Sequence, residues 1–360
     1  MRQLFPIRRS LLLALVVVVL PACGDASDDG SDPTVAPATT TAGAATTTVP
    51  SATLAPTTTA GATTTTVPSG GDGSTVVIGR STGTIVSAGL SREYVLHIPT
   101  GYDEAVPLPL VVVFHGLTMT ADGQASESGL PGLGDEEGFI TVFPEGRGDI
   151  QRWLFELDSV EIDITTENPD IALVSDLLDK LSEELSVDSD RIYAVGFSNG
   201  GWIASAVACT LSDRFAAAAP VAGIMDYGAD CAPDDPVPLV TFHGTSDQFE
   251  PFEGGTENAP LRGSLRTDLG GNFDELPVSG NPILESSVPV KVGLWADLNG
   301  CEGDPRSSVA DEKTTRWEYT CPETDPVVFY EIAGGTHGWN IAFGFDTSEK
   351  LWDFLSSQSR

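Results

Sequence analysis

A serine set between glycines is the first residue in this chain that could do chemistry. The segment GFSNGG, residues 196–201, fits the pattern G-x-S-x-G, follows an apolar run and precedes an Ala-rich stretch, 202–210, that has the composition of a helix. A strand, a sharp turn and a helix in this order expose the serine hydroxyl as a nucleophile. The segment GRSTG, 79–83, fits the same pattern, but strand-like residues follow it. The context therefore predicts Ser198, and not Ser81, as the nucleophile.

A serine of this kind needs a base, and the chain contains 4 histidines. His337 lies in the glycine-flanked segment GGTHGW, 334–339, where a loop can bring an imidazole over the serine. His97 lies in a predicted strand. His115 and His243 each end an apolar run in a His-Gly pair, where we expect the ring to bind the backbone. His337 is therefore the predicted base.

An acid must orient the imidazole, and two amides must bind the developing oxyanion. Asp247 follows an apolar run and lies between the serine and the histidine in the sequence. The order Ser, Asp, His is that of α/β-hydrolases. Asp226 is the alternative acid. We predict that the amides of Asn199, directly after the nucleophile, and Leu117, in the loop after an earlier apolar run, form the oxyanion hole.

These residues need a framework that brings distant segments together. Leucines at 173, 177, 178 and 181 recur at helical spacing and predict an amphipathic helix over about 171–185. An alternating pattern predicts an opening strand at 94–98, and short apolar runs predict buried strands at 110–114, 139–143, 191–195, 239–242 and 327–332. Strands that alternate with helices predict an α/β fold with a mainly parallel central sheet flanked by helices. Residues 74–360 are predicted to form this one catalytic domain.

The N-terminal residues have a different composition. Residues 1–23 combine early arginines with a short apolar run and resemble a signal peptide. They end at Cys23 in a lipobox-like context, which predicts a lipid-anchored lipoprotein; cleavage after Ala26 is the alternative and gives a secreted protein. Residues 24–73 repeat a Thr/Ala/Pro pattern with almost no large apolar side chains, which predicts a disordered linker.

Cysteine usage and charge narrow the function further. Without Cys23, four cysteines remain, an even number that favours two disulfides in an exported protein, and we favour the sequence-local pairs Cys209–Cys231 and Cys301–Cys321. The formal net charge is −34, which disfavours nucleic acid and anionic membranes as partners, so we expect membrane contact only through a lipid anchor. No Cys-x-x-Cys, His-Glu-x-x-His or P-loop motif occurs, and we predict no metal or cofactor.

Taken together, these motifs resemble those of the polyhydroxybutyrate depolymerase and feruloyl esterase group of α/β-hydrolases, also called carbohydrate esterase family 1. The landmarks include FHG, FPEG, AAAPVAG, HGTSD, LNGC and GGTH at 114–116, 143–146, 217–223, 243–247, 298–301 and 334–337. The resemblance implies a serine esterase without cofactors, the three catalytic roles given above, and substrate-lining aromatic residues at Trp153 and Trp339. Core packing is the alternative for these two indoles. Residues 256–286 resemble an insertion and make substrate transfer from relatives unsafe.

Two other functional classes remain open from the sequence. A serine peptidase of the prolyl-oligopeptidase kind shares the motif around Ser198, although such enzymes usually carry a large accessory domain. A non-catalytic envelope protein on a hydrolase scaffold would have an incomplete set of catalytic residues. The sequence does not predict the acyl group, the alcohol or the oligomeric state.

Overall fold

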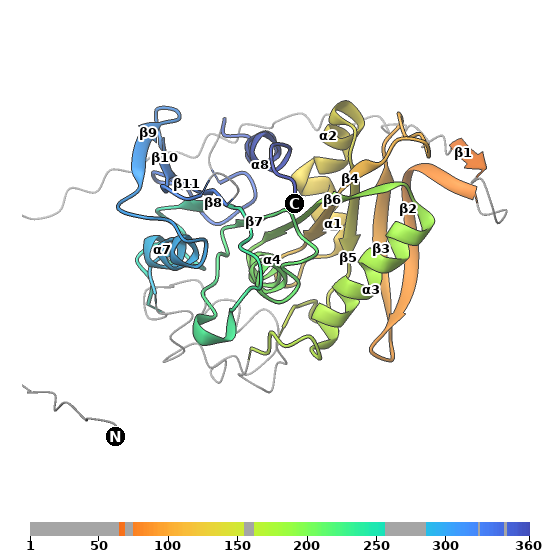
Figure 1. Cartoon of the computed structure of the whole chain (residues 1–360), viewed down its shortest axis with the longest axis horizontal. Coiled ribbons are helices and arrows are strands. Elements are labelled where there is room, and N and C mark those ends of the chain that lie inside the picture. Colours follow the sequence, from red (N-terminus) through yellow and green to blue (C-terminus); the bar gives the residue numbers. More distant parts are fainter. Residues whose placement is uncertain (1–64, 69–74, 155–161, 256–285, 323–324, 342–343) are drawn as a thin grey trace, which may run out of the picture. The chain divides into compact units, whose positions relative to one another are not determined.

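The computed structural model describes residues 65–68, 75–154, 162–255, 286–322, 325–341 and 344–360 (Figure 1). All of them belong to the compact unit Ala60–Arg360. The predicted signal peptide, Cys23, most of the predicted linker and nearly all of the predicted insertion lie outside the described residues. One strand, β1 (Thr65–Pro68), falls inside the predicted linker and pairs with Thr75–Ile78 in antiparallel fashion.

The described strands form one 11-stranded sheet in the order β1-β2-β3-β5-β4-β6-β7-β8-β11-β10-β9. Six consecutive strands pair in parallel and form its centre: β5 (Ile140–Pro144), β4 (Leu108–Phe114), β6 (Val187–Phe197), β7 (Ala217–Val221), β8 (Leu239–Gly244) and β11 (Val327–Ile332). Antiparallel strands extend both edges: β2 (Thr75–Ser87) and β3 (Leu90–Ile98) at one, β9 (Arg306–Val309) and β10 (Thr314–Glu318) at the other. The mainly parallel sheet predicted from the sequence is confirmed.

Helices cover both faces of this sheet (Figure 1). One hydrophobic core contains residues of α3 (Pro169–Glu184), α4 (Asn199–Thr210) and α7 (Val288–Leu298). The other contains residues of α1 (Ala121–Ser128), α2 (Leu130–Glu137) and α8 (Thr347–Leu355). None of the described helices is long and apolar enough to span a membrane.

The sequence of β4 shows why the sheet is covered on both faces. Leu110, Val112 and Phe114 belong to the first core, whereas Val111 and Val113 belong to the second. A strand whose side chains are apolar on both faces is stable only where helices cover both, because each exposed face would leave apolar surface in water. The same need shapes α3, whose apolar positions face the sheet and whose bounds agree with the predicted helix 171–185.

Candidate active site

The candidate catalytic residues all follow central parallel strands at their carboxyl ends. Ser198 follows β6, Asp247 lies in the loop after β8, and His337 lies in the loop after β11. Because neighbouring parallel strands end at the same edge of a sheet, residues far apart in the sequence meet there. Ser81 lies inside strand β2, opposite Leu96, as its sequence context predicted.

Ser198 occupies a sharp strand-to-helix turn with φ 53° and ψ −122°, a conformation that is costly for a residue with a side chain. The flanking glycines permit the turn because the backbone approaches itself closely there. A Cβ at Gly196 would lie 2.0 Å from the Gly200 oxygen, and one at Gly200 would lie 2.1 Å from the Phe114 oxygen. This strand-to-helix turn, the nucleophile elbow, therefore depends on glycine at both positions. The Ser198 side chain makes no capping hydrogen bond to α4, so its hydroxyl is left for catalysis.

The structure brings the three predicted catalytic side chains into one hydrogen-bonded chain. His337 Nε2 lies 2.9 Å from Ser198 Oγ, and His337 Nδ1 lies 2.7 Å from Asp247 Oδ2. With the proton on Nδ1, the imidazole donates to the carboxylate and presents an unprotonated Nε2 to the serine hydroxyl. This arrangement can remove the proton from Oγ as the oxygen attacks an electrophilic carbon.

The Asp247 carboxylate is buried and held on both oxygens. Its Oδ1 accepts hydrogen bonds from the backbone amides of Phe249 and Glu250, each at 2.8 Å. Burial opposes ionisation, but the hydrogen bond and charge of His337, followed by His243 and the Glu250 amide, lower the pKa of Asp247 below its ordinary value. The carboxyl group is thus ionised and positioned to orient the imidazole.

The two His-Gly histidines bind the backbone, as predicted. His115 Nδ1 lies 2.8 Å from the Gly116 oxygen, and its Nε2 accepts a hydrogen bond from the Gly146 amide at 2.9 Å. His243 Nε2 lies 2.8 Å from the Glu250 oxygen. Burial lowers the pKa of His243 and lowers that of His115 to about 4, so both rings stay neutral and hold loops in place.

The loop after β4, which carries the predicted oxyanion donor Leu117, packs directly against the elbow. A Cβ at Gly200 would also lie 2.6 Å from the His115 oxygen, and one at Gly116 would lie 3.0 Å from the Phe197 ring. Within the part of the chain that the structure describes, no hydrogen bond uses the amides of Leu117 or Asn199. The two amides are available to a ligand oxygen.

The structure contradicts the prediction that Trp153 and Trp339 line the substrate site. Both indoles have no exposed area. The Trp153 indole N–H donates to the His115 oxygen at 2.8 Å, and the Trp339 indole N–H donates to Ser348 Oγ at 2.9 Å. Each ring buries its apolar body while its single donor is satisfied inside the protein, so neither forms a wall of an open site.

Aromatic side chains that the sequence did not single out lie at the site instead. The rings of Phe197 and Phe249 have their centroids 5.0 Å from the His337 ring, with interplanar angles of 42° and 45°. Phe197 is buried, and Phe249 is half-buried in the loop that also carries Asp247. Phe197 was part of the serine motif and Phe249 lies two residues beyond the acid, so proximity to the motifs was the only signal available.

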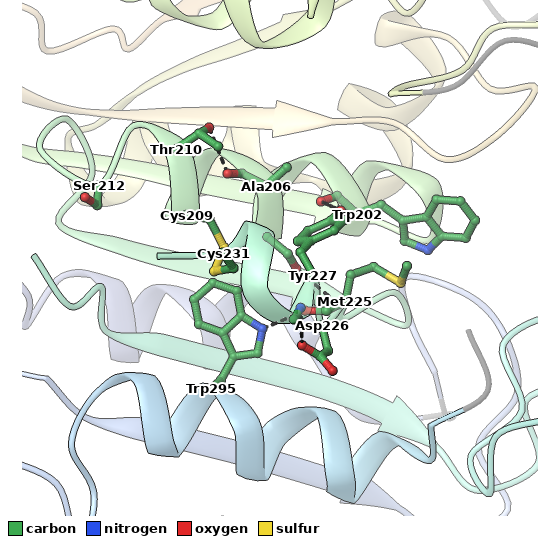
Figure 2. Close-up of a disulfide and its surroundings, with 12 residues drawn as sticks. Trp202, Ala206, Cys209, Thr210, Ser212, Met225, Asp226, Tyr227, Cys231 and Trp295 are labelled. Atoms are coloured by element: carbon green, nitrogen blue, oxygen red, sulfur yellow. Dashed lines mark hydrogen bonds between the residues drawn. A yellow bond between two sulfur atoms is a disulfide. The ribbon is translucent and has the colours of Figure 1, made fainter. Parts of the chain in front are cut away.

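Both disulfides pair as predicted, Cys209 with Cys231 and Cys301 with Cys321. The first joins the end of α4 to the loop after β7 and lies beside Tyr227 and Trp295 (Figure 2). In the same loop, the carboxylate of Asp226, the alternative acid, accepts a hydrogen bond from the Gly228 amide at 2.7 Å. Asp247, and not Asp226, is the acid that bonds His337.

Comparisons with known proteins show which proteins this chain resembles. Residues 133–238 match the model of the prolyl oligopeptidase family. The chain is 27% identical over 266 residues to feruloyl esterase B of Piromyces equi, which covers 71% of this chain and 45% of that protein. It is 28% identical over 270 residues to feruloyl esterase C of Emericella nidulans, which covers 74% of this chain and 84% of that protein. It is 30% identical over 261 residues to the esterase-like protein NocK of Nocardia uniformis subsp. tsuyamanensis, covering 69% of this chain and 71% of that one.

The chain belongs to the feruloyl-esterase-like group of α/β-hydrolases. A solved structure of this fold, acetyl xylan esterase from Aspergillus awamori, matches with a TM-score of 0.52 and 13% identity over 77% of this chain and 99% of that one. At this identity the likeness shows the fold alone. The chain spans 45% of the length of the Piromyces feruloyl esterase, so this member of the group resembles a part of that larger protein.

Proposed function

We propose that this α/β-hydrolase is a serine esterase that hydrolyses carboxylic esters through an acyl-enzyme. The observation that carries the proposal is the chain of hydrogen bonds from Ser198 Oγ through His337 to Asp247, with distances of 2.9 and 2.7 Å. The geometry is that of a nucleophile, a general base and an orienting acid. Family membership supports the ester as the bond that is cleaved.

The proposed reaction has two halves. Ser198 Oγ attacks the ester carbonyl carbon while its proton moves to His337 Nε2, and the amides of Leu117 and Asn199 bind the carbonyl oxygen as it becomes negative. The tetrahedral intermediate collapses, the C–O bond to the alcohol breaks, and His337 returns the proton to the departing oxygen. Water then attacks the acyl-enzyme by the same route and releases the carboxylic acid together with the free serine.

We propose that the substrates are esters of small acyl, hydroxyacyl or hydroxycinnamoyl groups on neutral oligomers or polymers. Feruloyl esterases among the relatives favour an aromatic acyl group, and the half-buried ring of Phe249 beside His337 offers an apolar surface for one. A net charge of −34 disfavours polyanionic substrates because it repels them. Polyhydroxybutyrate-type oligomers are the alternative within the same chemistry.

We propose that the enzyme acts outside the cell. The two disulfides support an oxidising compartment, since such bonds are rare in reducing ones. The signal-peptide pattern of residues 1–23 supports export, and Cys23 supports a lipid anchor at the end of the linker 24–73, with cleavage after Ala26 as the alternative.

The test compares the purified enzyme with its Ser198→Ala and Ser81→Ala variants. Ester hydrolysis is expected to disappear in the first and to persist in the second, because Ser81 lies inside β2. A panel at equal ester concentration then compares methyl ferulate, short p-nitrophenyl esters, hydroxybutyrate oligomers and a long-chain triglyceride. Preference for the triglyceride would overturn the substrate proposal.

A serine peptidase is the second candidate, favoured by the match of residues 133–238 to the prolyl oligopeptidase family. A p-nitroanilide and a p-nitrophenyl ester with the same acyl group distinguish the two functions. Faster release from the anilide would favour the peptidase. Faster release from the ester, lost in Ser198→Ala, would favour the esterase.

A further inference from the structure

We propose that Trp153 is a positioning residue that joins the nucleophile elbow to the oxyanion loop and so sets the spacing of the two oxyanion donors. The inference deepens the proposed function and rests on it. It assigns a role to an indole that has no exposed area and therefore cannot contact substrate. Two sets of hydrogen bonds carry it, one to each half of the oxyanion hole.

The first set ties Trp153 to the elbow. The side chain of Asn199, which is 3% exposed, accepts a hydrogen bond from the Trp153 amide at 2.9 Å and donates one to the Trp153 oxygen at 3.3 Å. An amide side chain that uses both its acceptor and a donor on one residue fixes that residue in distance and in orientation. Asn199 thus serves twice, because its own backbone amide is the donor next to the nucleophile.

The second set ties Trp153 to the loop after β4. Its indole N–H donates to the His115 oxygen at 2.8 Å. The His115 ring in turn holds the Gly116 oxygen through Nδ1 at 2.8 Å, and the Met119 amide donates to the same oxygen at 3.1 Å. In a trans peptide the carbonyl and the following N–H point in opposite directions. Fixing the Gly116 carbonyl therefore fixes the direction of the Leu117 amide.

The segment that carries Trp153 is also held in place by the buried Asp170 of α3. The Asp170 carboxylate, which has no exposed area, accepts hydrogen bonds from the Leu154 amide at 2.8 Å and from Arg147 Nε at 2.9 Å. Arg92 donates to the same carboxylate at 3.0 Å and lies 5.7 Å from the centre of the Trp153 ring. Buried charges held in this way form a rigid support, because moving one would leave others unpaired.

Stabilisation of an oxyanion depends on where its donors lie, since preorganised donors act without rearrangement as charge develops. The Asn199 amide lies on α4 and the Leu117 amide on the loop after β4, and Trp153 binds residues of both segments. Loosening this connection leaves Ser198 and the hydrogen bonds of His337 in place. The expected loss is therefore in kcat and in affinity for a tetrahedral analogue, with little change in KM.

Trp153→Phe is the test, because it keeps an aromatic ring and both backbone hydrogen bonds while it removes the indole N–H and part of the buried indole volume. The matched control is Trp295→Phe. Trp295 is 1% exposed, lies on α7, and donates its indole N–H to a backbone oxygen, that of Met225, at 2.7 Å (Figure 2). Each variant loses one buried indole-to-carbonyl hydrogen bond and the same side-chain volume, so any general cost of these losses appears in both.

For Trp153→Phe we expect kcat, normalised to active sites titrated with a fluorophosphonate, to fall about 10- to 100-fold, with KM within about twofold. The inhibition constant of a boronic acid, whose boronate oxygen occupies the oxyanion hole, should rise by a similar factor. Trp295→Phe should change neither. Equal losses of kcat in the two variants, or unchanged kcat in Trp153→Phe, would overturn the inference.

A second variant keeps the test informative if Trp153→Phe folds poorly. Asn199→Ala retains its backbone amide but loses both hydrogen bonds to Trp153, so it should show the same fall in kcat. If both residues act through one connection, the double variant loses less than the product of the single losses; independent, merely structural effects would multiply. Failure of the proposed function is distinguishable, because it would show as wild-type protein without ester hydrolysis, or as hydrolysis that survives Ser198→Ala.

Discussion

Acidification is expected to destabilise the fold through His115. Burial lowers the pKa of this ring from its ordinary value of 6.5 to about 4. Its Nε2 accepts the Gly146 amide and its Nδ1 faces the Gly116 oxygen, so a second proton would meet the Gly146 N–H. The unfolded chain therefore takes up a proton near pH 6.5 that the folded chain refuses until about pH 4.

The magnitude follows from the two pKa values. Because the folded-state pKa is the lower one, stability is at its full value above pH 6.5 and declines as the pH falls towards 4. One proton costs about 1.4 kcal/mol per pH unit, so His115 alone removes roughly 3 kcal/mol of unfolding free energy across this window. The lowered pKa of buried His243 acts in the same direction.

The assay is urea unfolding of the wild type, His115→Gln and a control variant, His97→Gln, at several pH values from 7.5 to 4.5. His115→Gln is less stable at neutral pH because it disturbs the contact with Gly146, but it lacks the titrating ring. The stability advantage of the wild type over His115→Gln should therefore shrink by about 2.5 kcal/mol between pH 7.5 and pH 4.5. His97→Gln, a substitution on strand β3, keeps His115 and should therefore lose the same unfolding free energy on acidification as the wild type.

NMR can observe the protonation state of the His115 ring directly. In histidine NMR spectra of the folded enzyme, the His115 signals should show a neutral ring protonated on Nδ1 and should not titrate above about pH 5. Titration of His115 near pH 6.5 in the folded state would refute the argument. So would a wild-type stability advantage over His115→Gln that stays constant from pH 7.5 to 4.5.

Three further predictions concern the elbow, a disulfide and the anchor. Gly200→Ala should lower kcat at least about 100-fold, because its Cβ would lie 2.1 Å from the Phe114 oxygen. The control Gly132→Ala should retain wild-type kcat, because a Cβ there has no neighbouring atom within 4 Å. Equal activity of the two variants would contradict this geometry. Replacing both cysteines of the Cys209–Cys231 disulfide, whose sequence separation is 22, by Ala should lower the unfolding free energy by about 3 kcal/mol in urea titrations, and an unchanged midpoint would count against a stabilising bond. If Cys23 is lipidated, Cys23→Ser should release the enzyme from the membrane fraction, and unchanged fractionation would favour cleavage after Ala26.

The sequence predicted the framework well where pattern and local chemistry agree. The apolar run 110–114 is covered on both faces in the structure because every side chain in it is apolar. Ser198 was separable from Ser81 because a tight turn needs glycine on both sides and a helix after it, and the structure shows why a Cβ fails at Gly196 and Gly200. These features depend on neighbours in the sequence, which a reader of the sequence can see.

Tertiary packing decided what the sequence could not. Whether Trp153 faces a cleft or the core depends on the path of the loop after β5, which the buried Asp170 sets from another element. Phe249 lies beside His337 because the Asp247 carboxylate folds its own loop through two backbone amides. Neither arrangement has a periodicity or a motif, since both arise from contacts between segments far apart in the chain.

The misplaced tryptophan shows how proximity to a catalytic motif can mislead about role. Resemblance placed an aromatic residue near the site, and Trp153 is near it: its backbone binds Asn199 and its indole binds His115. Yet only a buried indole can hold a backbone oxygen without competition from water, and burial removes the ring from substrate. A substrate must therefore contact a more exposed ring, and Phe249 is half-buried beside His337. Substitution of Phe249 should change the acyl preference of the enzyme while Ser198 stays reactive. Phe249→Leu should therefore lower kcat/KM for methyl ferulate more than for an acetyl ester, and an equal loss on both would assign Phe249 to holding His337 instead.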